Sequence, residues 1–96
     1  MKVGVARFTL YLPQSDSLKE KRGIIKPVVE RTRRRFHVSI AEVEDLDDLR
    51  VATIGFSIVS NSSAHIDEML QTILASIEHE IDGARLGEIE TEILEV

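Results

Sequence analysis

The stretch SLKEKRGIIKPVVERTRRRF, residues 17–36, decides the fold, because a helix start signal leads directly into a long apolar stripe. Ser17 and Glu20 form the S-x-x-E pattern of a capping box. At about 100° per residue the following positions share one core-facing stripe: Leu18, Ile25, Val28, Val29, Thr32 and Phe36. Pro27 falls on the opposite side, so we predict one helix with a bend between Gly23 and Pro27.

Strands flank this helix on both sides. VGVARFTLYL (3–12) is rich in β-branched and aromatic residues and is followed by Pro13, which predicts a first strand. HVSIAEV (37–43) alternates as a short strand, EDLDDL (44–49) is polar enough to be a turn, and RVATIGFSIVS (50–60) is a longer strand. The two strands after the helix therefore form a hairpin.

A second helix and a last strand complete the chain. NSSAHIDEMLQTILASIEHEIDG (61–83) starts at a serine cap, Ser62 or Ser63, and ends at Gly83. Its apolar face consists of Ile66, Met69, Leu70, Ile73, Ile77 and Ile81. LGEIETEILEV (86–96) alternates glutamate with apolar residues, as a half-solvated strand does. The order βαββαβ predicts a single ferredoxin-like α+β domain over residues 1–96, with both helices on one face of an antiparallel sheet.

The two faces of the predicted sheet differ in bulk. The larger apolar residues should meet the helices: Ala6, Phe8, Leu10 and Leu12 with Ala52, Ile54, Phe56 and Ile58. The opposite, open face carries smaller residues with few charges at its centre, and a second copy of the same sheet is the simplest cover for it. We therefore expect a homodimer, with an interface at Val5, Arg7, Thr9, Tyr11, Thr53 and Ser57.

Charge is divided along the chain. Residues 1–39 hold ten Lys/Arg and three Asp/Glu, a net +7, whereas residues 40–96 hold two and fourteen, a net −12, giving −5 in total. Long cationic side chains on a helix are suited to phosphate contacts. We expect RNA or a ribonucleoprotein to be bound at Lys19, Lys21, Arg22, Lys26, Arg33, Arg34 and Arg35. The alternative is a solvated basic face, neutralised by Glu30 and by the acidic second half.

Other functions find less support. Base stacking on the open face requires aromatic rings there, but Phe8 and Phe56 belong to the helix-facing set, which leaves Tyr11. The three histidines are dispersed, and the acidic turn at 44–49 lacks the ligand ladder of a calcium loop, so we expect no metal. No nucleophile elbow or phosphate loop is present. We therefore expect neither enzymatic activity nor a cofactor.

The environment is constrained by what the sequence lacks. It contains no cysteine, which is compatible with a reducing compartment. No run of about 18 apolar residues and no signal-peptide pattern is present. We expect a cytoplasmic protein that does not enter a membrane.

Several short motifs resemble the YlxP-like family of small bacterial proteins of unknown function. They are SLKEKR (17–22), KP (26–27), RF-V at Arg35, Phe36 and Val38, and S-AEV at Ser39, Ala41, Glu42 and Val43. The resemblance implies a ferredoxin-like fold. Because genes of the family commonly neighbour those of transcription-elongation and translation-initiation factors, it also suggests a role around RNA or ribosome maturation. Many members have tryptophan where this chain has Leu49 before Arg50.

The sequence therefore favours a non-enzymatic, RNA- or ribosome-associated accessory factor that binds through its first helix. The alternative is a regulatory or assembly module that binds a small ligand or a protein at the open sheet face or at the dimer interface.

Overall fold

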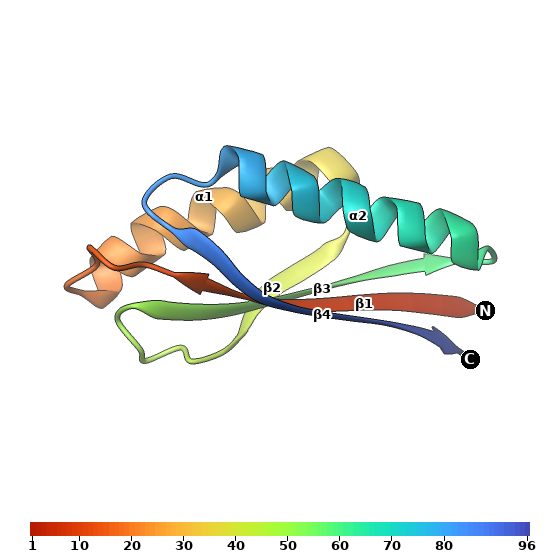
Figure 1. The fold of residues 1–96 in the computed structure, drawn as a ribbon, viewed down its shortest axis with the longest axis horizontal. Coiled ribbons are helices and arrows are strands. Elements are labelled where there is room, and N and C mark those ends of the chain that lie inside the picture. Colours follow the sequence, from red (N-terminus) through yellow and green to blue (C-terminus); the bar gives the residue numbers. More distant parts are fainter.

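Two helices cover one face of a four-stranded antiparallel sheet in the computed structural model, which describes Met1 to Val96 (Figure 1). The elements are β1 Lys2–Tyr11, α1 Leu18–Phe36, β2 Ser39–Glu44, β3 Val51–Ser60, α2 Ser63–Glu80 and β4 Arg85–Glu95. The strands lie in the order β2-β3-β1-β4, so β1 and β3 are central and β2 and β4 are edges. The predicted ferredoxin-like fold is confirmed. Neither helix is long and apolar enough to cross a membrane.

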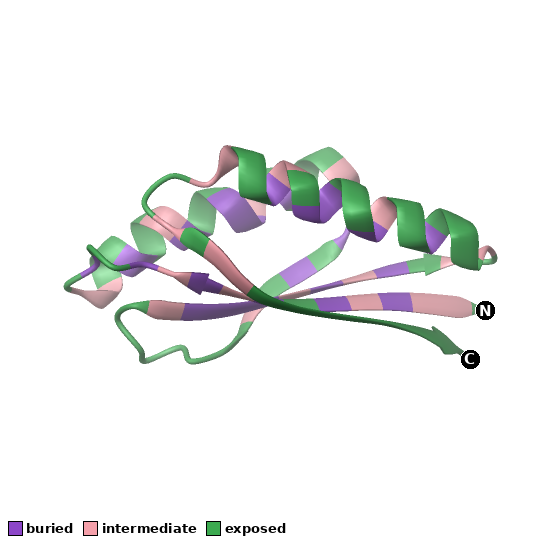
Figure 2. Cartoon of the chain, viewed as in Figure 1, coloured by how far each residue is buried: buried purple, intermediate pink, exposed green.

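The core lies between the helices and the inner face of β1 and β3. Buried and less buried residues alternate along β1 and along β3 from Ile54 onward (Figure 2), as expected where one sheet face is covered. The rings of Phe8 and Phe56 meet edge to face with centroids 6.3 Å apart. The whole predicted inward set is buried: Ala6, Phe8, Leu10, Leu12, Ala52, Ile54, Phe56 and Ile58.

Helix α1 begins and ends at specific caps. The Ser17 hydroxyl accepts a hydrogen bond from the Glu20 N–H at 3.0 Å, while the Glu20 carboxylate accepts from the Asp16 N–H at 3.0 Å. The helix continues through Pro27, which is exposed, as predicted. It stops at His37, whose backbone is left-handed (φ 54°) and whose N–H donates to the Arg33 carbonyl at 2.9 Å.

The cap at His37 shifts one predicted boundary. A strand starting at His37 was expected, but a left-handed residue cannot extend a strand, and β2 begins at Ser39. Helix α2 has Ser62 as its cap, with the hydroxyl accepting from the His65 N–H at 3.2 Å. After α2, the backbone of Gly83 takes a positive φ of 79° in the turn that leads to β4.

Candidate nucleic-acid interface

Helix α1 carries eight cationic side chains, and the structure separates them by what they already bind. Three pair with carboxylates of the acidic half: Lys21 with Glu42, and Arg31 and Arg35 with Glu80. The remaining five form no ion pair: Lys19, Arg22, Lys26, Arg33 and Arg34. The acidic half of the chain therefore leaves most of the basic helix free.

Lys21 was predicted to contact RNA, and the structure corrects this prediction. Its side chain is buried, and Nζ donates to the carbonyls of Asp45 at 2.6 Å and Asp48 at 2.7 Å. Glu42 Oε2 lies 2.9 Å from Nζ but forms no hydrogen bond, so this third contact is an ion pair. Lys21 holds the β2–β3 loop against α1 and is not available to a nucleic acid.

The sequence contained a signal for this burial. Lys21 precedes Val28 by seven residues and Thr32 by eleven, which places it within the apolar stripe rather than beside it. A lysine on that stripe has to find acceptors inside the fold, and the backbone carbonyls of the following loop supply them.

Arg33 and Arg35 remain at the surface but are already in contact with the fold. Arg33 donates to the Ile40 carbonyl on β2 at 2.7 Å. Arg35 donates to Glu80 at 2.8 Å and to Ser76 Oγ at 3.2 Å, and its guanidinium lies 5.2 Å from the centre of the Phe36 ring. Both side chains join α1 to a neighbouring element, so their loss would affect stability as well as charge.

The outer side of α1 brings the free cations together. A hollow there is lined by Arg22, Gly23, Lys26, Pro27, Glu30, Arg31 and Arg34. Arg22, Lys26 and Glu30 also border a second groove, between α1 and the edge strand β2, whose floor includes Ile25 and Val29. Arg31 and Gly23 were not among the predicted contacts, and their places on the outer face follow from the same helical spacing.

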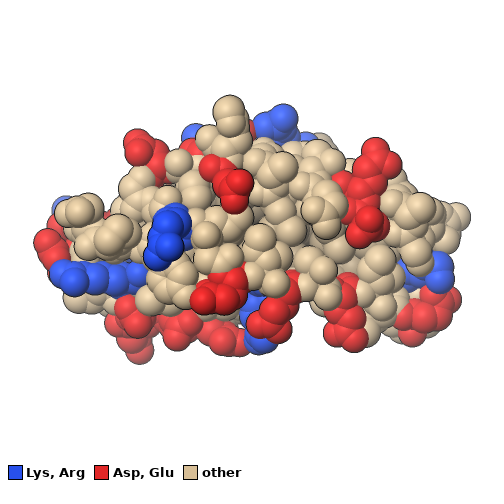
Figure 3. All heavy atoms as spheres, in the orientation of Figure 1, with Lys and Arg blue, Asp and Glu red and all other residues tan.

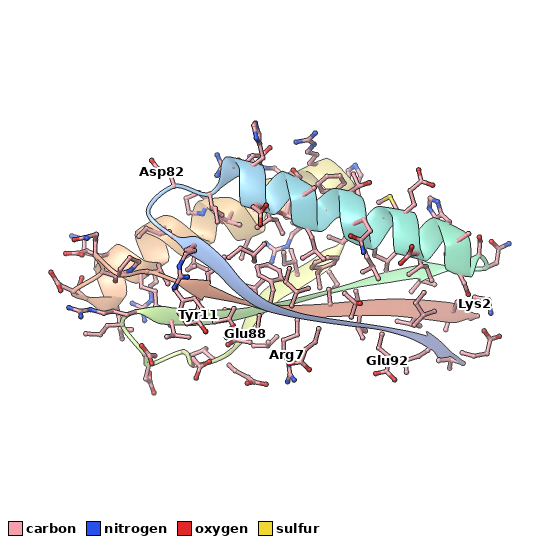
Figure 4. All side chains as sticks on the ribbon, viewed as in Figure 1. Lys2, Arg7, Tyr11, Asp82, Glu88 and Glu92 are labelled. Carbon is pink, nitrogen blue, oxygen red and sulfur yellow. The ribbon has the colours of Figure 1, made fainter.

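Acidic side chains line the sheet side of the molecule. In the view that has α2 and β4 in front, they follow the sheet edge, and others lie on α2 (Figure 3). On the open face, Arg7 points away from the helices (Figure 4) and donates to Glu90 on β4 and to Glu44 at the end of β2. The hydrogen bond from Arg7 to Glu90, together with the negative charges of Glu90 and Glu44, raises the pKa of Arg7 above its ordinary value. Arg7 is therefore paired with carboxylates on both edge strands.

The open-face aromatic ring is held within the sheet. The Tyr11 hydroxyl donates to Glu88 at 2.5 Å, which lowers the pKa of Glu88 and raises the pKa of Tyr11. The ring covers Gly87 so closely that a Cβ on that glycine would lie 2.3 Å from Tyr11 Cε2. The guanidinium of Arg85 lies 5.2 Å from the ring centre. Tyr11 is therefore committed to its own neighbours rather than to a nucleic-acid base.

The predicted dimer residues lie on the open face of the sheet, and all but one of them are at least partly exposed. Val5 and Ser57 line a hollow there together with Ala41 and Gly55. Thr53, in contrast, is buried, and its hydroxyl donates to Asp45 at 2.6 Å, because the β2–β3 loop folds over this end of β3. Thr53 is therefore not available to a dimer interface, contrary to the prediction. No group of three or more His, Asp or Glu side chains is arranged to hold a metal ion.

Comparison with known sequences finds a matching family model and a relative in Bacillus subtilis. The family model described as "Protein of unknown function (DUF503)" matches residues 3–91. A Bacillus subtilis (strain 168) protein, "Uncharacterized protein YlxP", is 33% identical over 76 residues, covering 79% of this chain and 83% of that protein.

Solved structures are similar at the level of the backbone. A de novo designed protein with a ferredoxin fold superposes with a TM-score of 0.54 at 15% identity, covering 98% of this chain and 83% of that one. A dimeric ferredoxin-like protein from an uncultured marine organism has a TM-score of 0.44 at 10% identity, covering 98% and 94%. The designed protein supports the fold alone.

Proposed function

The chain belongs to the DUF503 family, whose function is unknown, and from this premise we propose that it is a non-enzymatic accessory factor that binds RNA or a ribonucleoprotein through α1. The observation that carries the proposal is the group of cations on the outer face of α1 that no carboxylate neutralises. Their partners have to come from outside the chain or from solvent.

The structure changes which residues are proposed as contacts. Lys19, Arg22, Lys26 and Arg34 are exposed and form no hydrogen bond or ion pair with the protein. Arg33 and Arg35 are secondary, because each is already bonded to β2 or α2. The acidic sheet side would repel a polyanion and so orient it toward α1. Binding to RNA or a ribonucleoprotein, and a sequence without cysteine, fit a cytoplasmic location.

The test uses three substitutions in one variant, Arg22→Gln, Lys26→Gln and Arg34→Gln. The wild type should bind single-stranded RNA with an affinity that falls steeply as salt rises, because counterions are released. Loss of three phosphate contacts should reduce the slope of log affinity against log salt by roughly 2. Fluorescence anisotropy with labelled RNA measures this slope, and ribosomal subunits provide a second target.

The matched control removes three cations outside α1: Lys2→Gln, Arg50→Gln and Arg85→Gln. Both triple variants have a net charge of −8, from −5 and three lost positive charges. The control should keep the wild-type slope. An equal reduction of the slope in both triple variants would show that net charge, not the α1 surface, sets the affinity. Equal slopes for all three proteins would show that none of these cations contacts the RNA. Either result would contradict the proposal.

We also propose, as a second candidate, that the open sheet face binds a protein partner, in the first instance a second copy of the chain. The supporting observation is a hollow between the central strands and β2, bordered by the small residues Gly55, Ser57 and Ala41. Val59 and Leu94 add apolar surface at one end of the same face. Sedimentation as a monomer at micromolar concentration would contradict this assignment.

A further inference from the structure

The centre of the basic surface on α1 contains the two residues that are least favourable inside a helix, glycine and proline. Gly23 and Pro27 lie four residues apart and both line the outer hollow with Arg22, Lys26 and Arg34. Both are exposed. No atom lies within 4 Å of the position that a Cβ on Gly23 would take.

Packing against the core therefore does not explain why glycine stands at position 23 or proline at position 27. Gly23 has room for a side chain, and Pro27 points away from the core stripe formed by Ile25, Val28 and Val29. Residues that break a local rule without a gain in the fold are expected at functional sites. Their position at the middle of the free cations connects them to the binding surface.

The pair has one chemical consequence, an available backbone acceptor. Proline has no N–H, so Pro27 cannot donate the helical hydrogen bond to the carbonyl of Gly23. Gly23 is itself exposed and lines the hollow, so a carbonyl without its helical partner lies at this surface. The hollow thus presents two kinds of acceptor, this backbone carbonyl and the Glu30 carboxylate, beside Arg22, Lys26 and Arg34, which can only donate.

A ligand that satisfies both the cations and the carbonyl must carry a negative group and a hydrogen-bond donor close together. A phosphodiester oxygen accepts from the cations but offers nothing to a carbonyl. In RNA each phosphate is adjacent to a ribose 2′-hydroxyl, which donates as well as accepts, and DNA lacks this group. A carboxylate-rich peptide also offers carboxylates to the cations and backbone N–H groups to the carbonyl, so it is tested as a competing ligand.

We propose that the hollow binds a ribose-phosphate unit of RNA, with the Gly23 carbonyl accepting a hydrogen bond from a 2′-hydroxyl and Arg22, Lys26 and Arg34 contacting the flanking phosphates. This rests on the proposed RNA-binding function and adds to it the selection of RNA over DNA. Pro27 acts as a positioning residue, because its missing N–H leaves the carbonyl free.

The experiment compares three labelled probes of about twelve nucleotides: oligouridylate, its 2′-deoxy form and its 2′-O-methyl form. The 2′-O-methyl group accepts hydrogen bonds but cannot donate them. The wild type should bind oligouridylate about five- to tenfold more tightly than either other probe, the effect of about one hydrogen bond. This comparison requires no variant.

The variant Pro27→Ala supplies an N–H that can bond to the Gly23 carbonyl. It should bind all three probes with the affinity that the wild type has for DNA, and it should keep the wild-type salt dependence. The matched control is His37→Gly, which relieves the left-handed cap at the end of α1 without contacting the hollow. This control should retain the RNA preference, and circular dichroism checks that both variants are folded.

The outcomes separate the two proposals. Equal wild-type affinity for the three probes would overturn the 2′-hydroxyl contact and leave RNA binding intact. A Pro27→Ala variant that still prefers RNA would also overturn it. Binding of a polyglutamate peptide as tight as that of oligouridylate would show that charge alone determines the site. Failure to bind any of these probes or ribosomal subunits would remove both proposals.

Discussion

At the scale of single residues, Lys21 is the clearest case of a charge used for folding. All three of its contacts lie within the chain: the carbonyls of Asp45 and Asp48, and the carboxylate of Glu42. A buried ammonium is tolerated only when its donors are satisfied. The β2–β3 loop is therefore held by a side chain that reaches it from α1.

Replacing Lys21 with methionine should destabilise the protein by about 3 kcal/mol, because the Glu42 charge and two loop carbonyls lose their partner. Urea unfolding followed by circular dichroism measures the loss. The control Lys19→Met, at an exposed position two residues earlier, should change stability by less than about 0.5 kcal/mol. Adding Glu42→Leu to Lys21→Met should recover part of the loss, and no recovery would show that the carboxylate is not the main unpaired group.

Some residue-level features were predictable and others were not. The Ser17 and Ser62 caps and the inward sets of β1 and β3 follow from local patterns and were found. The burial of Lys21 could have been found from its spacing to Val28 and Thr32. The burial of Thr53 could not, because it depends on how the β2–β3 loop folds over β3, which local propensity does not determine.

At the scale of elements, α1 combines strong and weak helix signals. Its capping residues and apolar stripe favour a helix, whereas Gly23 and Pro27 oppose one. The helix nevertheless runs without a break to Phe36, because its buried face packs on the sheet and on α2. This explains why the sequence could predict a single helix but not whether the exposed pair serves binding.

Pro27→Ala should raise the free energy of unfolding by up to about 3 kcal/mol, and Gly23→Ala by up to about 1 kcal/mol, the costs of these residues in a helix interior. Both sites are exposed, so no packing has to be rebuilt. Thermal and urea unfolding measure the gains. A loss of stability in Pro27→Ala would mean that the fold requires the proline, and would weaken the argument that it is retained for binding.

At the scale of the whole molecule, two surfaces of opposite charge face opposite ways. The helix layer presents the free cations of α1, and the open sheet face presents Glu44, Glu88, Glu90 and Glu92 with Arg7 among them. The division of charge along the sequence predicted two such regions. Their separation in space could not be predicted, since it depends on which carboxylates the fold brings to α1, and Glu42 and Glu80 are the ones that reach it.

This arrangement predicts opposite responses to salt for the two proposed interfaces. RNA binding at α1 should weaken as salt rises. Pairing of two open faces brings like charges together, so screening should strengthen it, and the dimer should be more populated in roughly 0.5 M salt than at low salt. Sedimentation velocity at several protein concentrations distinguishes the two directions.

Two variants test where the interface lies. Ser57→Glu adds a carboxylate at the centre of the open face and should favour the monomer, whereas Ala75→Glu adds the same charge on the exposed side of α2 and should not. A dimer that dissociates in high salt, or that survives Ser57→Glu, would place the interface elsewhere. A contact between the basic α1 of one copy and the acidic sheet face of another is the arrangement that salt would weaken.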